Sequence, residues 1–147
     1  MNLTPNFKRI EFEKNGPMPD DVVPTYALLC SLILEPVRAY TGTPIRITSG
    51  YRSPEHNRII GGSASSQHVA TPVHCAADFQ CPNLVDVFNW IRLQSGLPFD
   101  QCILEYGRVK EADTDDCIHI SYSVEPRRMA LVGATHNREP YLRVDVA

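Results

Sequence analysis

The chain has 147 residues, of which 43% are hydrophobic and 21% charged, as in one globular domain whose core needs no disulfides. Its net charge of −3 and isoelectric point near 5.9 predict no basic surface for nucleic acid or an anionic membrane. The N-terminus lacks the apolar stretch of a secretory signal, and no apolar run approaches the roughly 20 residues that span a bilayer. We therefore expect one domain over residues 1–147, made in the cytoplasm and monomeric, with no nucleic-acid or membrane partner.

The N-terminal part of the chain predicts an arm followed by the main helix. Residues 1–21 contain a short amphipathic piece around Phe12 and a polar turn, which we interpret as an ordered arm packed on the domain. Apolar residues then recur at helical spacing over residues 24–40. Pro24 suits the first turn of this helix, whereas Pro36 falls inside it and predicts a kink or a new helix start.

The rest of the chain alternates short strand-like runs with two further helical segments. Strands are expected at 45–49, 75–80, 101–107, 117–123, 129–133 and 141–146, and helices at 54–60 and 84–94. This order predicts an α+β fold: a small, mainly antiparallel sheet with helices packed on one side.

The segments 101–107 and 117–123 predict a hairpin that carries an acid and a histidine. If the loop between them is centred near residue 112, Glu105 stands opposite His119. Period-two alternation places His119 and Ser121 on one face of the hairpin. The apolar residues of the second strand fall on the other face: Ile118, Ile120 and Tyr122. An acid beside a histidine on a sheet indicates either a surface ion pair or a functional site.

Asp78 lies in a short apolar run, CAADFQ. A carboxylate in an apolar strand is costly unless it is paired or bound to a metal. Together with His68 and His119 it forms a His/His/Asp set, which is a normal shell for catalytic zinc that leaves one position open for water.

Five motifs occur in order along the chain: SGYRSPEHN from Ser49, the pair Gly61-Gly62, Ser66-x-His68, AAD ending at Asp78, and IHIS around His119 after FDQCILE. This series resembles the zinc D-Ala-D-Ala peptidases, small cell-wall peptidases of bacteria and phages that share a fold with the Hedgehog signalling domain. The resemblance covers roughly residues 20–125.

The resemblance implies a Hedgehog/DD-peptidase-like fold, a zinc cofactor and a peptidoglycan peptide as substrate. It implies that His68, Asp78 and His119 are the zinc ligands. It also implies that Arg52 binds or polarises the substrate and that Ser66 helps to hold the substrate's terminal region.

The first departure from the family pattern lies between the first histidine and the aspartate. Nine residues separate His68 from Asp78, where the family usually has a shorter stretch, often with a glycine midway. His74 in this longer stretch thereby becomes a rival ligand. The Ser66-x-His68 pair and the preceding glycines favour His68, so we interpret the extra residues as a loop at the rim of the site.

The second departure concerns the general base. Many relatives carry a glutamate three residues before the last histidine, and here Asp116 takes that position. Aspartate is one methylene shorter, whereas Glu105 shares the predicted face of His119 and has the longer reach. We therefore favour Glu105 as the base that takes a proton from the attacking water, with Asp116 as the alternative, and Arg52 as the group that stabilises the developing oxyanion or clamps a carboxylate.

The five cysteines are an odd number without a repeated spacing, which argues against a disulfide framework. We expect free thiols in the core. Because Cys75, Cys81 and Cys117 lie near the proposed ligands, a thiolate ligand is an alternative, although no CxxC pair supports it.

The leading hypothesis is a zinc metallopeptidase that cuts D-Ala-containing peptidoglycan stems, of carboxypeptidase or endopeptidase type. Without a secretion signal, a phage lysin released at lysis or an enzyme associated with a virion fits best. The alternatives are a non-catalytic zinc-binding or wall-binding module with the same fold, and a purely structural virion protein.

Overall fold

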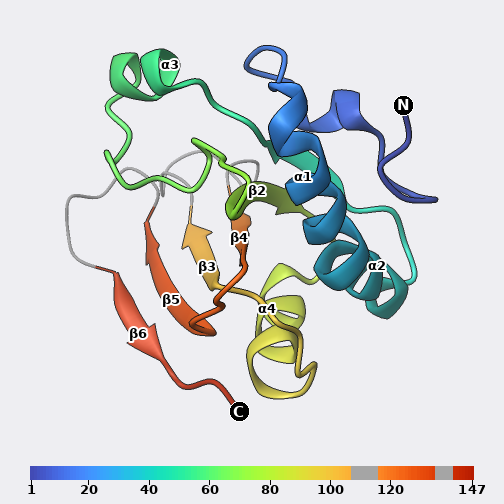
Figure 1. Ribbon diagram of the computed structural model, residues 1–147. Helices are drawn as coiled ribbons and strands as arrows, with labels where there is room; N and C mark the ends of the chain where they lie inside the picture. Colours follow the sequence, from blue (N-terminus) through green and yellow to red (C-terminus); the bar gives the residue numbers. More distant parts are fainter. Residues whose placement is uncertain (107–115, 135–140) are drawn as a thin grey trace.

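The computed structural model describes residues 1–106, 116–134 and 141–147. Its centre is one six-stranded sheet in the order β1-β2-β4-β3-β5-β6 (Figure 1). The strands are β1 (Arg46–Ser49), β2 (His74–Gln80), β3 (Gln101–Tyr106), β4 (Cys117–Ser123), β5 (Met129–Ala134) and β6 (Leu142–Val144). Among these strands the pair β3–β5 is parallel and the other neighbours are antiparallel. The α+β class is confirmed, but the sheet is larger than the small sheet expected.

The helices are α1 (Val23–Leu29), α2 (Glu35–Thr41), α3 (Pro54–Ile59) and α4 (Leu84–Leu93). Of these, α1 and α4 pack against the central strands, and α2 packs against α4 (Figure 1). On the sheet's helix side, Phe79, Ile118 and Ile120 are fully buried, because alternation along each strand sends every second side chain there. The opposite face carries the polar residues of β2 and β4. The expectation of helices on one side therefore holds for α1, α2 and α4.

The main helix contains the irregularity that Pro36 predicts. A π-helical turn, Cys30–Leu34, joins α1 to α2, and Pro36 lies in the first turn of α2. A proline cannot donate the backbone hydrogen bond and crowds the carbonyl four residues earlier, so the widened turn relieves that clash. The helix continues through Pro36 rather than ending there.

One helix of the described chain, Asp20–Thr41, is long and apolar enough to cross a bilayer by length and composition alone, with 22 residues and a mean hydropathy of 1.4 over its most apolar 18-residue window. The expectation that no such segment exists was wrong by this measure. Helices in the core of a globular domain can have the same length and composition. Here Tyr26, Leu29 and Ile33 of this helix are fully buried within the protein.

The N-terminal arm packs on the domain as expected. Phe7 and Phe12 are buried, although Ile10 is exposed. The carbonyl of Phe12 accepts a hydrogen bond from the Tyr51 amide at 2.8 Å. Next to it, a Cβ at Gly50 would lie 2.5 Å from the Phe12 carbonyl oxygen. The arm therefore holds the start of the SGYRSPEHN stretch in place through this hydrogen bond. The close approach of the two backbones requires a glycine at residue 50.

The hairpin of β3 and β4 has a different register from the one expected. Ile103 is the partner of His119, and Glu105 is the partner of Cys117. The pairing is displaced by two residues, so Glu105 still shares a face with His119 but stands diagonal to it. Residues 107–115 between the two strands lie outside the described residues, as do residues 135–140 between the expected strands 129–133 and 141–146.

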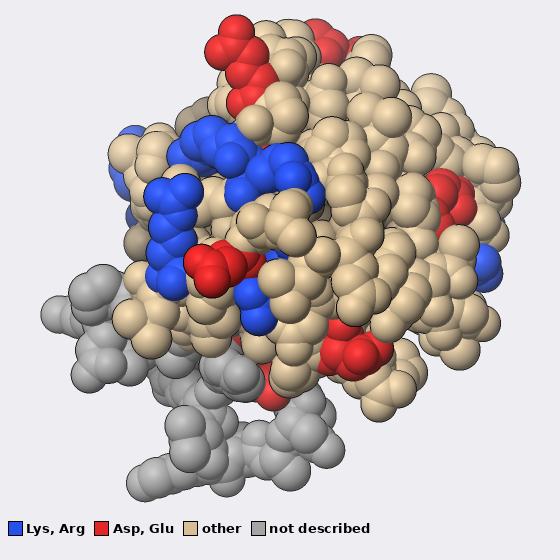
Figure 2. Space-filling model, turned by 90° about the horizontal axis from the view of Figure 1, so that it is seen from below, with Lys and Arg blue, Asp and Glu red and all other residues tan. Residues whose placement is uncertain are grey.

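Three arginines lie around the C-terminal segment of the described chain. Arg92 donates to the Asp145 carbonyl at 2.8 Å, and Arg128 donates to the Ala147 carbonyl at 2.9 Å. Arg143 and Arg128 also line a shallow groove of about 430 Å³ there. In the view from below, Lys and Arg side chains gather on one part of the surface around an acidic residue (Figure 2). Arg92 and Arg128 fasten the last residues of the described chain to α4 and to the loop before β5.

Candidate metal centre

Three side chains from distant parts of the sequence converge on the polar face of the sheet. His68 Nε2 lies 3.2 Å from Asp78 Oδ1, and His119 Nδ1 lies 3.0 Å from the same oxygen. The two histidine nitrogens are 3.2 Å apart. Asp78 and His119 are direct partners across β2 and β4, whereas His68 comes from the loop after α3. The structure brings together the three residues that the sequence indicated as ligands.

The tautomer of His68 is set by the backbone. His68 Nδ1 lies 2.7 Å from the carbonyl oxygen of Gly50, which can only accept, so Nδ1 carries the proton. The lone pair of Nε2 therefore points at Asp78 and His119. Such an outer hydrogen bond is the usual way in which a metal-binding histidine is oriented.

The charges in this cluster depend on one another. Burial alone would raise the pKa of Asp78, but the two histidines hold it far below its usual range. Burial alone would lower the pKa of His119, but the Asp78 carboxylate raises it above the ordinary value. Asp78 is therefore ionised although it is buried between two imidazoles. A positive charge at the point where the three side chains meet stabilises this ionised form.

The donor set fits a zinc ion. An unprotonated imidazole nitrogen and a carboxylate oxygen are both acceptors, and with His119 Nδ1 they lie within 4.8 Å of one another. Acceptors that converge in this way need a shared proton or a cation between them. Two imidazoles and one carboxylate are ligands that zinc takes at catalytic sites.

Glu105 lies beside this centre. Its carboxylate, an Asp78 oxygen and the Cys117 sulfur lie within 4.8 Å of one another. The Cys117 thiol lies 3.6 Å from Glu105 Oε2. Burial and then the neighbouring carboxylates raise the pKa of Cys117, which keeps its thiol protonated and disfavours a thiolate ligand. Cys75 is also buried, with its sulfur directed at the Thr25 carbonyl on the helix side.

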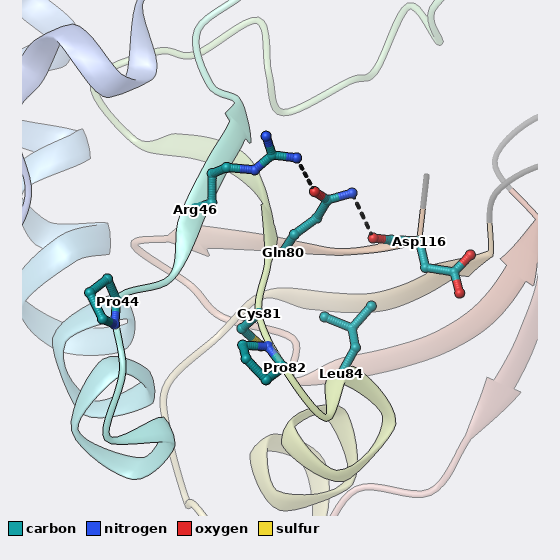
Figure 3. Close-up of a pocket in the computed structure, with 7 residues that line it drawn as sticks. All are labelled: Pro44, Arg46, Gln80, Cys81, Pro82, Leu84 and Asp116. Carbon is teal, nitrogen blue, oxygen red and sulfur yellow. Dashed lines mark hydrogen bonds between the residues drawn. The ribbon is translucent and has the colours of Figure 1, made fainter. Parts of the chain in front are cut away.

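Asp116 belongs to a different part of the surface. It lines an open pocket of about 380 Å³ at the end of β2 (Figure 3). Its backbone carbonyl accepts a hydrogen bond from Gln80 at 3.0 Å, and Gln80 in turn accepts one from Arg46. The Asp116 carboxylate points away from Gln80 in this view (Figure 3). Among the described residues that could hold a metal, Asp116 is absent from the two groups that contain Asp78.

Arg52 lies next to the centre and is held by its neighbours. Its amide donates to the His68 carbonyl at 2.9 Å, and its Nη1 donates to Asn57 at 2.9 Å. Its Nε is buried without a hydrogen-bond partner among the described residues, and its charge acts to lower the pKa of His119. A Cβ at Gly62 would lie 2.0 Å from Asn57 Oδ1, so this glycine makes room for the asparagine that positions Arg52.

Ser66 supports the loop that carries His68. Its hydroxyl accepts a hydrogen bond from the His68 amide at 3.3 Å, which is a local contact that shapes the turn. A substrate contact for Ser66 stays a prediction.

His74 does not join the metal centre. It pairs with Ser123, four positions along β2 from Asp78, and burial lowers its pKa. Its rim position agrees with the proposed loop insertion, and the geometry favours His68 as the ligand.

A buried carboxylate, Asp100, holds the residue before His68 in place, and the sequence patterns did not indicate it. Asp100 is almost fully buried and accepts hydrogen bonds from Gln67 at 2.8 Å and from the Arg127 side chain at 2.7 Å. This carboxylate ties the His68 loop to the segment before β5. The only signal in the sequence is an aspartate after a buried phenylalanine at the start of β3, which does not reveal its distant partners.

The three converging donors define a site that can hold a catalytic metal ion. The chain matches the family model of Peptidase M15 over residues 7–109, well over half of its length, and it therefore belongs to the M15 peptidases. No curated protein matches the chain. The matched region includes His68 and Asp78 and ends before His119, so the third donor is identified by the sheet geometry. Peptidases of this family are metal-dependent, typically with zinc.

Replacing Gly50 with alanine is expected to weaken both the fold and the metal site. The new Cβ would lie 2.5 Å and 2.6 Å from backbone atoms of Phe12, so the backbone must shift at a typical cost of about 1–3 kcal/mol. The same shift moves the carbonyl that orients His68, for which a loss of about 10- to 100-fold in metal affinity is typical. Chemical unfolding and metal titration measure the two effects.

Gly42 provides the matched control. It has φ +68°, and a Cβ added there would meet nothing within 4 Å, so alanine strains the backbone by about 1–2 kcal/mol without disturbing the metal centre. Gly42→Ala should lower stability but keep metal affinity. Equal metal affinity of the Gly50→Ala variant and the native protein would contradict the role of the Gly50 carbonyl.

Proposed function

We propose that the protein is a zinc-dependent peptidase that hydrolyses D-Ala-containing peptide stems of bacterial peptidoglycan. The observation that supports this most is the convergence of His68 Nε2, Asp78 Oδ1 and His119 Nδ1, with the His68 tautomer fixed by Gly50. Membership of the M15 peptidases supports the reaction class and the wall peptide as substrate.

His68, Asp78 and His119 would hold the ion in this proposal. When bound, zinc lowers the pKa of a coordinated water from about 15.7 towards 7 and polarises the scissile carbonyl. The Asp78 carboxylate would contribute a negative charge, since it is ionised at neutral pH because the histidines lower its pKa. The buried backbone contact of His68 keeps the ligand nitrogen in place between turnovers.

Glu105 acts as the general base in this proposal. It accepts the proton of the attacking water on a carboxylate oxygen and returns it to the leaving amine nitrogen. Its support is its place beside Asp78 on the same face of the sheet. Arg52, whose Nε has no partner among the described residues, stabilises the developing oxyanion or holds a substrate carboxylate.

The test is digestion of purified peptidoglycan and of a synthetic stem peptide ending in D-Ala-D-Ala. Mass spectrometry of the products should show one amide bond cut, with release of a new amine, and a chelator should stop the reaction. Release of free D-Ala identifies a carboxypeptidase, and internal cleavage identifies an endopeptidase. Zinc-loaded protein that binds sacculi without cutting any of these substrates would instead identify a non-catalytic wall-binding module.

Synthesis in the cytoplasm, release at lysis and a monomeric state stay predictions. The phage-lysin assignment is likewise a proposal, which rests on the sequence features alone.

A further inference from the structure

Tyr141 reaches Glu105 from the edge of the sheet. It lies immediately before the edge strand β6, and its hydroxyl donates to Glu105 Oε1 at 3.1 Å. Strand β5 stands between β6 and β3 in the sheet. The tyrosine side chain therefore crosses one whole strand to contact the acid.

Gly133 makes this crossing possible. It is the partner of Glu105 in the parallel pair β3–β5, and a Cβ built on it would lie 2.0 Å from Tyr141 Cδ1 and 2.5 Å from Cε1. The tyrosine ring thus occupies the space that any side chain at residue 133 would fill. With glycine at residue 133, the ring lies across β5 and places its hydroxyl at the Glu105 carboxylate.

The two oxygens of Glu105 are in different surroundings as a result. Oε1 accepts from the Tyr141 hydroxyl, and Oε2 lies 3.6 Å from the Cys117 sulfur. Burial and then the Glu105 charge raise the pKa of Tyr141, so its hydroxyl stays protonated and remains a donor. A hydroxyl that donates to one oxygen restricts the rotation of the carboxylate, whereas a thiol at 3.6 Å is a weak partner that a water can replace.

We propose that Tyr141 is a positioning residue that holds Glu105 by Oε1 and leaves Oε2 turned towards the metal centre. This inference rests on the proposed function, because it assigns the role through Glu105 as the base. It adds a residue from the C-terminal part of the chain, beyond the region matched by the family model. A carboxylate held in one orientation loses less freedom when it takes the proton, which raises turnover without changing substrate affinity.

The test is Tyr141→Phe, which keeps the ring over Gly133 and removes only the hydroxyl. We expect kcat to fall about 10-fold, as for loss of one hydrogen bond to a charged group, with KM and zinc content unchanged. Tyr40→Phe is the matched control, because the hydroxyl of Tyr40 on α2 also donates to a carboxylate, Oδ2 of Asp86 on α4, at 2.9 Å in an exposed position. That variant should turn over at the native rate.

A double variant separates positioning from a general structural role. If Tyr141 acts through Glu105, adding Tyr141→Phe to Glu105→Gln should cause no further loss. Gly133→Ala, which displaces the ring, should lower kcat by a similar factor, and combining it with Tyr141→Phe should again add little.

The inference would be overturned if Tyr141→Phe turned over at the native rate. It would also be overturned if the double variant lost kcat by the product of the two single losses. Either result would leave the proposed peptidase intact. Full activity of Glu105→Gln would overturn the assignment of the base and this inference together. A native protein that cuts no wall substrate would overturn the proposed function itself, and the inference with it.

Discussion

Replacing Asp78 or His119 with alanine is expected to abolish metal binding and turnover together. Each residue supplies one of three converging donors, and Asp78 Oδ1 contacts both histidines. Loss of an outer partner of a ligand typically costs about 10- to 100-fold in affinity or activity, so loss of a ligand itself should exceed that range. Metal content after dialysis and the rate of stem-peptide hydrolysis measure the effect.

The two histidines of the segment before Asp78 provide the matched comparison. His68→Ala should lose the metal, because its Nε2 lies within reach of Asp78 and His119. His74→Ala should keep it, because His74 pairs with Ser123 at the other end of β2. The reverse outcome would show that the longer stretch before Asp78 delivers His74 rather than His68 to the metal.

Replacing Glu105 with glutamine is expected to lower kcat by about 100- to 10,000-fold, the usual contribution of a general base. Glutamine keeps the size of the side chain and can still accept from Tyr141 through its carbonyl oxygen, but it cannot take a proton. Zinc content should stay at the native level, since Glu105 is absent from the His/Asp/His donor set. Steady-state kinetics and metal analysis on the same preparation separate the two properties.

Asp116→Asn is the control for Glu105→Gln. Asp116 lines the pocket at the end of β2 together with Arg46 and Leu84, and its carboxylate points away from Gln80 (Figure 3), so turnover should change little. An inactive Asp116→Asn variant together with an active Glu105→Gln variant would show that Asp116 is the base. The inference that Glu105 is the base because it shares a sheet face with His119 would then be wrong.

The sequence was a good guide where local patterns decide the structure. Alternating residues placed His119 and Glu105 on one face and Ile118 and Ile120 on the other, and the sheet has that arrangement. The position of Pro36 predicted a disturbance in the main helix, which the structure shows as a π turn.

The pairing of distant segments was harder to predict. The hairpin register differs by two residues from the expected one, because the sequence of residues 107–115 contains no motif that specifies a turn and with it the register. The contact of Tyr141 with Glu105 could not be predicted either, since it depends on the parallel pair β3–β5 and on Gly133 in that pair. The anchor Asp100 is similar, because its partners are 27 and 33 residues away along the chain.

The most direct test of the account is the metal content of the native protein, purified without added metal and measured by elemental analysis. We expect close to one zinc per chain, bound by His68, Asp78 and His119 and lost in the alanine variant of each. A native protein that contains no zinc and binds none on titration, while its fold is intact, would contradict the central claim.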